Sequence, residues 1–308
     1  MSERIREMNI IGKRFLFFII SGVVIVAGII ALIAFGLKPG VEFKSGTEVT
    51  ISFSENVTAT KSQVTQTLTK LGYEPGTFIV RMAESDYILS LPELNDAGKE
   101  QLRSGLTEEI GPFKDGGFYT VSAIAAGQTV RNASIAVVVS AIGILLYLAW
   151  AFRRMPNPLR WGTCAIVSLA HDILVVVGVF AILSGLFGWQ VDLMFVAAVL
   201  TVSGYSVNDA IVIFDRIREG VRRNPGLDFE LVTNRALVET MSRTLITGIG
   251  TVFVLIALMI VVGGPIQNLV VVLLVGVVTG TYSGMCTAAP LLVVWQKGEL
   301  GRFIGRKA

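Results

Sequence analysis

Residues 15–37 read FLFFIISGVVIVAGIIALIAFGL and carry no charged side chain. An α-helix needs about 20 such apolar residues to cross the hydrocarbon core of a bilayer. Five more apolar runs of similar length follow along the chain, at residues 133–152, 161–186, 191–214, 244–262 and 266–295. The sequence therefore predicts an α-helical polytopic membrane protein with six transmembrane helices.

The first run has a second interpretation, as a secretory signal. Four basic residues precede it, and Ala34-Phe35-Gly36 near its end loosely resembles a cleavage site. The run is longer than the apolar region of an ordinary signal peptide. We therefore expect residues 1–37 to stay in the protein as a cytoplasmic N-terminus and the first transmembrane helix.

Composition supports a membrane protein and limits its partners. Hydrophobic residues make up 53% of the 308 residues and charged residues only 16%, more apolar than a water-soluble domain, and the mean hydropathy is +0.68. The net charge of +3 gives no strongly basic field, which argues against nucleic acid as a partner. Cys164 and Cys286 lie in apolar runs, so no disulfide framework is expected.

Basic residues are spread unevenly over the segments between the runs. They gather before the first run, at residues 153–160, across residues 216–235 and in the tail, residues 297–308. The connections at 184–191 and 263–267 have none. By the positive-inside rule, we expect both termini to face the cytoplasm and residues 132–296 to form the second to sixth transmembrane helices. Residues 38–131 are expected to lie outside, which in a bacterium is the periplasmic or extracellular face of the inner membrane.

The segment between the first two runs has the pattern of a small α+β domain. Helix-like stretches at 60–72 and 93–110 alternate with strand-like stretches at 48–54, 77–82, 86–91 and 118–124. This βαββαβ order predicts a ferredoxin-like extracytoplasmic domain, with two helices on one face of a four-stranded antiparallel sheet. It has no histidine, cysteine, glycine-rich phosphate loop or nucleophile motif, so we expect no enzyme activity, cofactor or metal ion. It is either a contact domain or a folded spacer.

Asp209 is an acidic residue deep in the fourth apolar run. An ionisable group there costs several kcal/mol unless it faces water or a partner, which makes it a functional hypothesis. Tyr205 and Ser206 precede it by one helical turn, so we expect them to hydrogen-bond its carboxyl group. Burial favours the neutral acid, whereas water or a cation favours the carboxylate.

Arg243, at the start of the fifth run, is the expected partner of Asp209. Because arginine stays protonated, it attracts the carboxylate and releases the protonated acid, so the pair predicts a proton switch. Two alternatives stay open: a permanent structural ion pair, or an arginine that only reaches for the membrane surface.

His171 and Asp172 in the third run are the second pair of ionisable residues, and His171 is the only histidine in the chain. Adjacent residues on a helix project about 100° apart, so we expect no shared contact. They either relay protons or form hydrogen bonds between helices.

Gly276, Gly280 and Gly284 in the sixth run follow one another at intervals of four residues. Small residues at this spacing leave one helix face nearly bare and let a neighbouring helix approach closely. We therefore expect a helix-packing face there.

A long motif now identifies a related family. Residues 204–219 read GYSVNDAIVIFDRIRE, and this string resembles the fourth-span signature of the SecF branch of the SecD/SecF family, in the resistance-nodulation-division superfamily. RTLIT at residues 243–247, GTYS at 280–283 and His171-Asp172 add to it. The resemblance covers essentially the whole chain.

The resemblance implies a function in protein export. It implies a SecD partner, proximity to the SecYEG channel, and proton flow that moves outside domains which pull on unfolded preprotein. The family's fourth-span acid falls on Asp209 and its fifth-span arginine on Arg243, while Asn208 and Thr247 lie in the same motifs. The resemblance leaves open whether the ion is H⁺ or Na⁺.

One motif departs from the family pattern. Where the family has Asp-Phe-Thr-Gly-Gly-Thr, residues 42–47 read EFKSGT. The loss of one glycine restricts the backbone, which puts any special turn there in doubt.

Two rival functions stay open. A small-molecule or lipid exporter of the same superfamily would resemble this chain in the membrane, although such proteins carry larger outside domains. A non-transporting assembly scaffold would tolerate apolar residues at Asp209 and Arg243.

Overall fold

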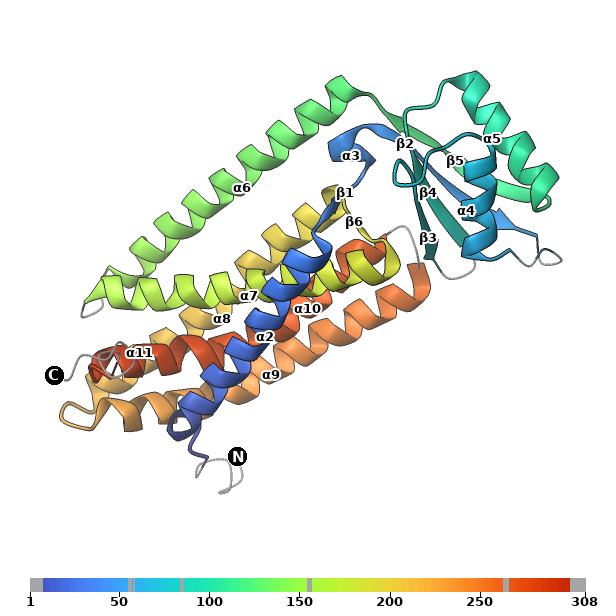
Figure 1. Cartoon of the computed structure of the whole chain (residues 1–308). Coiled ribbons are helices and arrows are strands. Elements are labelled where there is room, and N and C mark those ends of the chain that lie inside the picture. The colour runs from blue at the N-terminus through green and yellow to red at the C-terminus, as the bar shows by residue number, and fades with distance from the viewer. Residues whose placement is uncertain are drawn as a thin grey trace.

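Six long helices and one small α+β domain form the structure, a computed structural model that describes residues 8–54, 57, 59–83, 86–153, 157–262 and 266–299. Within these residues, six helical segments are long and apolar enough to cross a membrane, which confirms the predicted number. The α+β domain lies at one end of the helix bundle (Figure 1). The start of α2 (Arg14–Phe35) and the end of α11 (Ala289–Gln296) lie at the opposite end.

Several membrane helices are longer than the apolar runs that predicted them. The helices between α2 and the last membrane segment are α6 (Ala123–Phe152), α7 (Pro158–Phe187), α8 (Leu193–Arg223) and α9 (Phe229–Val262). α6 begins within the segment assigned to the outside domain, and α9 begins well before residue 244. The reason is that these helices extend past the apolar core of the bilayer with polar residues. One example is the ion pair between Arg216 of α8 and Glu239 of α9.

The last membrane segment changes its helical geometry in the middle. α10 (Gln267–Ser283) passes into a π-helix, η3 (Gly284–Ala288), before α11 continues. Pro290 lies in the first turn of α11. Because proline has no N–H and its ring clashes with the carbonyl group four residues earlier, it disturbs the regular hydrogen bonds at this point. π-Helices are rare, and those that occur often lie at functional sites.

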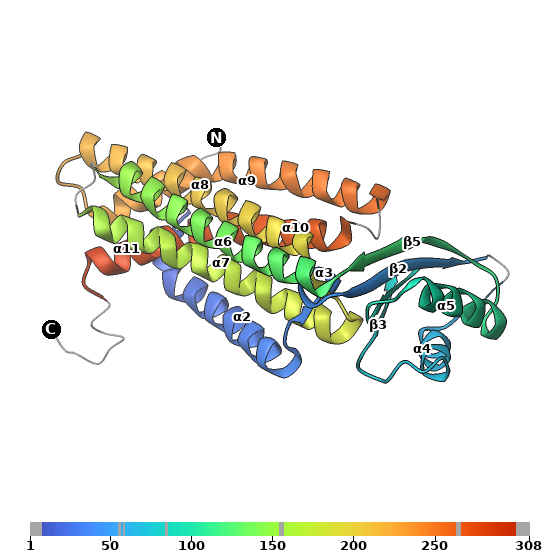
Figure 2. The same ribbon diagram turned by 90° about the horizontal axis from the view of Figure 1, so that it is seen from above.

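The α+β domain, called here the sheet domain, has the predicted βαββαβ order. Its elements are β2 (Gly46–Phe53), α4 (Lys61–Lys70), β3 (Ile79–Ala83), β4 (Asp86–Leu91), α5 (Asp96–Glu109) and β5 (Phe113–Val121). The strands lie in the order β3-β4-β2-β5, all antiparallel, and both helices cover the same face (Figure 2). The order is that of a split βαβ arrangement. The last strand begins and ends earlier than predicted, because Ser122 caps the start of α6.

A second, two-stranded sheet joins the sheet domain to the bundle. β1 (Lys38–Pro39), directly after α2, pairs in parallel with β6 (Gln190–Val191) between α7 and α8. A short helix, α3 (Val41–Lys44), leads from β1 to the turn before β2. Ser45 has a φ of +67°, a conformation that favours glycine. The turn at residues 42–47 therefore keeps a glycine-like backbone although serine stands where the family has glycine.

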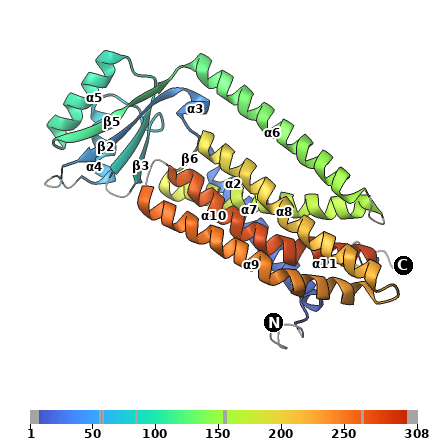
Figure 3. The ribbon, with the colours of Figure 1, turned by 180° about the vertical axis from the view of Figure 1, so that it is seen from behind.

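α6 is packed against the rest of the chain mainly near its two ends. Ala126 is buried at one end, and Leu148 and Phe152 at the other, while the middle of the helix exposes apolar side chains such as Val138. Figure 3 shows α6 inclined away from the other helices. The middle of α6 therefore needs lipid or another protein to cover it.

Candidate functional site

Asp209 of α8 is buried, and no described residue hydrogen-bonds its Oδ2 atom. Its side chain is 7% exposed. Arg243 of α9 is near enough for its charge to attract the carboxylate, but its guanidinium donates no hydrogen bond to Asp209 Oδ2. The structure thus brings the two predicted residues within electrostatic reach of each other and leaves the acid only partly compensated.

The expected hydrogen bonds from Tyr205 and Ser206 to Asp209 are wrong. The Ser206 hydroxyl donates across the helix interface to Asp172 Oδ2 at 2.5 Å, and the Tyr205 hydroxyl is buried without a partner among the described residues. A hydroxyl group has a single hydrogen to donate. Ser206 donates it to the fully buried carboxyl group on α7, so none is left for Asp209 on its own helix.

Asp172 joins three membrane helices. It is fully buried, and its Oδ2 atom accepts hydrogen bonds from Ser206 of α8 and, at 2.7 Å, from Ser283 of α10. Its Oδ1 atom lies 2.9 Å from Nδ1 of His171. The expectation that these neighbours share no contact is therefore wrong, because rotation about their side-chain bonds can bring the two groups together although adjacent residues project about 100° apart.

His171 extends this polar region toward the first membrane helix. Its ring stacks on that of Tyr282 of α10, with 6.2 Å between the centroids, and the Tyr282 hydroxyl donates to the carbonyl oxygen of Phe17 in α2 at 3.0 Å. Sequence analysis placed Ser283 and Tyr282 in the motif at residues 280–283 but predicted none of these contacts. The motif at residues 280–283, which places polar residues beside a bare glycine face, is the signal that could have found them.

The three glycines of α10 and η3 lie against α8. A Cβ atom at Gly276 would be 2.1 Å from Val202, and one at Gly280 would be 3.4 Å from Ser206. At Gly284, where the π-helix begins, it would be 3.6 Å from the Cβ atom of Asp209. The bare face therefore brings the α10 backbone directly against the helix that carries Asp209.

Gly276→Ala is expected to lower the free energy of unfolding by about 1–3 kcal/mol, because the new methyl group overlaps Val202 in a packed interface. Thermal unfolding of the purified chain in detergent measures the effect. Val202→Ala should restore much of the loss when combined with it. Gly250→Ala on α9, where a Cβ atom meets nothing within 4 Å, is the control. Equal stability of Gly276→Ala and Gly250→Ala would contradict close packing at this face.

Polar residues of the two motifs also face outward from this chain. Arg243, Asn208 and Thr247 are exposed, and Thr247 Oγ1 donates only within its own helix, to the carbonyl oxygens of Arg243 and Thr244. Exposed polar groups at membrane depth require water or a partner's helices. The surface next to Asp209 is thus suited to a second membrane protein.

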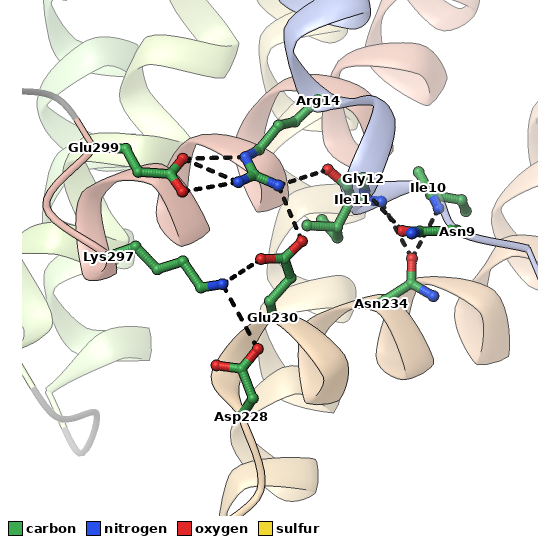
Figure 4. Close-up of polar contacts among 10 residues, drawn as sticks. All are labelled: Asn9, Ile10, Ile11, Gly12, Arg14, Asp228, Glu230, Asn234, Lys297 and Glu299. Carbon is green, nitrogen blue, oxygen red and sulfur yellow. Dashed lines mark hydrogen bonds and ion pairs between the residues drawn. The ribbon is translucent and has the colours of Figure 1, made fainter. Parts of the chain in front are cut away.

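The end of the bundle opposite the sheet domain is held together by charged side chains (Figure 4). Arg14 of α2 pairs with Glu230 of α9 at 3.0 Å and with Glu299 at 2.8 Å. Lys297 pairs with the same Glu230. Asn234 of α9 accepts hydrogen bonds from the backbone N–H groups of Ile10 and Ile11. These contacts fix the start of α9, the helix that carries Arg243, at the end of the bundle remote from the sheet domain.

No metal site accompanies these residues: within the described ranges, no three His, Cys, Asp or Glu side chains are grouped to hold an ion. Of the predicted tail, residues 297–308, the structure describes only Lys297 to Glu299.

Comparison with protein families gives two matches in this chain. Residues 105–298 match the model for the C-terminal part of protein export membrane proteins SecD/SecF. Residues 30–57 match the SecD/SecF GG motif. The turn at Ser45 lies in the second match, and Asp172, Asp209, Arg243 and the three glycines of α10 and η3 lie in the first.

Full-length relatives and a solved structure agree with these matches. The chain is 38% identical to the protein translocase subunit SecF of Thermobaculum terrenum, over 97% of each chain. It is 35% identical to that of Anaerolinea thermophila, over 98% of each. The crystal structure of SecDF, a translocon-associated membrane protein from Thermus thermophilus, matches with a TM-score of 0.82 and 26% identity, covering 94% of this chain and 39% of that one.

Proposed function

The chain belongs to the SecD/SecF family of protein-export membrane proteins, as a SecF-type subunit that functions in protein translocation, and we propose that the proton motive force drives its action. In this proposal both termini lie in the cytoplasm and the sheet domain lies outside the inner membrane. The observation that carries the proposal is the buried, only partly compensated Asp209 within reach of the charge of Arg243.

Protonation of Asp209 is the proposed driving step. The charged carboxylate attracts Arg243, whereas the neutral acid does not, so each proton bound and released changes the force between α8 and α9. α10 follows because its glycine face rests against α8 and Gly284 of the π-helix rests against Asp209. The sheet domain then moves with the outer ends of these helices and acts on the emerging unfolded preprotein.

A SecD-type partner is expected to complete the membrane part. In Bacillus subtilis, a relative named protein translocase subunit SecDF contains a region 32% identical to this chain, which covers 39% of it. A cover of this kind would supply partners for the exposed Arg243, Asn208 and Thr247. We propose that the partner's helices lie over this surface and that the complex works next to the SecYEG channel.

Export into vesicles under separate ion gradients tests this function. Vesicles that contain the SecYEG channel, the SecD-type partner and this chain should export preprotein faster with a proton gradient than without one. The increase should vanish when a protonophore collapses that gradient and persist when a sodium ionophore collapses only a sodium gradient. If the faster export were lost only when the sodium gradient is collapsed, Na⁺ would be the driving ion. If export were equally fast without either gradient, the chain would act as an assembly scaffold instead.

A further inference from the structure

The sheet domain touches the membrane helices through a half-buried arginine. Arg81 of β3 donates from Nη1 to Oδ1 of Asn268 at 2.9 Å, and its guanidinium carbon lies 5.8 Å from the centre of the Trp189 ring. Asn268 belongs to the first turn of α10 and is only 4% exposed. These two residues are 187 positions apart in the sequence, so the contact links the domain directly to the last membrane segment.

Asn268 also reaches α8, the helix of Asp209. Its Nδ2 atom donates to Asp192 Oδ2 at 2.5 Å and to the carbonyl oxygen of Gln190 in β6 at 3.0 Å. Asp192 in turn caps α8, because its Oδ1 atom accepts the N–H of Phe195 at 2.7 Å. A single amide side chain therefore connects the starts of α8 and α10 to β3.

Further contacts hold the same region of the sheet domain. Ser90 of β4 donates to the Gln190 side chain at 2.6 Å. Glu42 of α3 accepts the N–H of Leu193, the first residue of α8, at 2.5 Å. One hydrogen bond thus joins β4 of the sheet domain to β6, and another joins the neighbouring α3 to the start of α8.

The charges in this region are poorly hydrated and depend on one another. Burial raises the pKa of Glu48 and Asp192 above the usual range and lowers the pKa of Arg81, while both carboxylates attract Arg81 and oppose its shift. Glu42, whose pKa burial also raises, adds a third acid. Removing one member of such a group leaves the others half-buried with less compensation, which costs stability.

We propose that Arg81 and Asn268 form the joint through which movement of α8 and α10 is transmitted to the sheet domain. This inference rests on the proposed function, because it assumes that the two helices move when Asp209 changes its charge. Arg81 is a positioning residue in this joint: it acts on the domain through its contacts and takes no part in the proton step.

Distance measurements in the assembled complex test the joint. Spin labels at Thr107→Cys on α5 and Ile260→Cys on α9, with both native cysteines replaced by alanine, report the position of the domain relative to the bundle. In the otherwise unchanged protein, a proton gradient should shift the distance distribution. Arg81→Gln and Asn268→Leu should each abolish the shift, and Arg81→Lys, which keeps a donor and the charge, should restore part of it.

Arg103→Gln is the matched control, because Arg103 pairs with Asp115 at 2.7 Å and stacks on Phe118, both within the sheet domain. It should leave the shift unchanged. A full shift in Arg81→Gln and Asn268→Leu would overturn the joint while leaving the proposed function intact. Absence of the shift in the unchanged protein would instead overturn the proposed function, and the joint with it. Circular dichroism and co-purification with the partner confirm that each variant is folded and assembled.

Discussion

Asp209→Asn is expected to abolish the part of preprotein export that depends on the proton gradient, while the complex with the SecD-type partner still assembles. Asparagine has nearly the shape of aspartate but cannot bind or release a proton at this site. The substitution removes no hydrogen bond at Oδ2, because that atom accepts none from the described residues. The measurement is the rate of export into vesicles with and without the gradient.

Asp215→Asn supplies the control for this experiment. Asp215 lies on the same helix, but its side chain is 58% exposed and pairs with Arg218 on the helix surface. An exposed ion pair of this kind contributes little to stability, and its carboxyl group is not buried in the membrane. Export by Asp215→Asn should therefore keep its full dependence on the proton gradient. If Asp209→Asn also kept it, Asp209 would not be the coupling group.

A double substitution tests whether Asp209 and Arg243 act as a pair. Residues that work as one unit give strongly non-additive losses. Adding Arg243→Gln to Asp209→Asn should therefore cause little further loss of gradient-dependent export, although Arg243→Gln alone should lose most of it. Additive losses would show that the two residues act separately.

The number of spans followed from the sequence because the bilayer imposes a length on apolar segments, but helix ends did not. The beginning of α9 at Phe229 and the end of α8 at Arg223 lie among polar residues. There the helix continues through backbone hydrogen bonds and surface ion pairs, which an apolar pattern does not record. The π-helix at Gly284–Ala288 was invisible for a similar reason, since it is a change of hydrogen bonding rather than of polarity.

The charged residues of the site could be predicted because a charged group in a membrane span is energetically costly, but the residues that contact them could not. Asp209, Arg243 and Asp172 stand out because charged groups are rare in apolar runs. Ser206 was assigned to the nearest acid along its own helix, whereas its acceptor is on α7. The contact from Arg81 to Asn268 joins two segments that no local pattern relates. Which side chains meet depends on how the helices pack, and no local pattern of residues shows that packing.

Asp172→Ala is expected to lower the free energy of unfolding of the chain by about 2–4 kcal/mol. It removes the acceptor shared by Ser206 and Ser283, two hydrogen bonds between membrane helices worth about 1 kcal/mol each, and leaves a cavity besides. Asp172→Asn keeps a carbonyl oxygen that both serines can reach, so its loss should be smaller. Unfolding in detergent measures both variants, and Thr163→Ala on an exposed part of α7 should be near neutral.

The same two variants also decide between the two roles left open for His171 and Asp172. If Asp172 only holds α7, α8 and α10 together, Asp172→Asn keeps gradient-dependent export at a level set by its stability, unlike Asp209→Asn. If Asp172→Asn loses this export while its stability is nearly unchanged, Asp172 carries protons itself. The contact of its Oδ1 atom with His171 at 2.9 Å would then be a step in the path. Unchanged stability of Asp172→Ala would contradict the structural role, because a fully buried carboxyl group that joins three helices cannot be removed without cost.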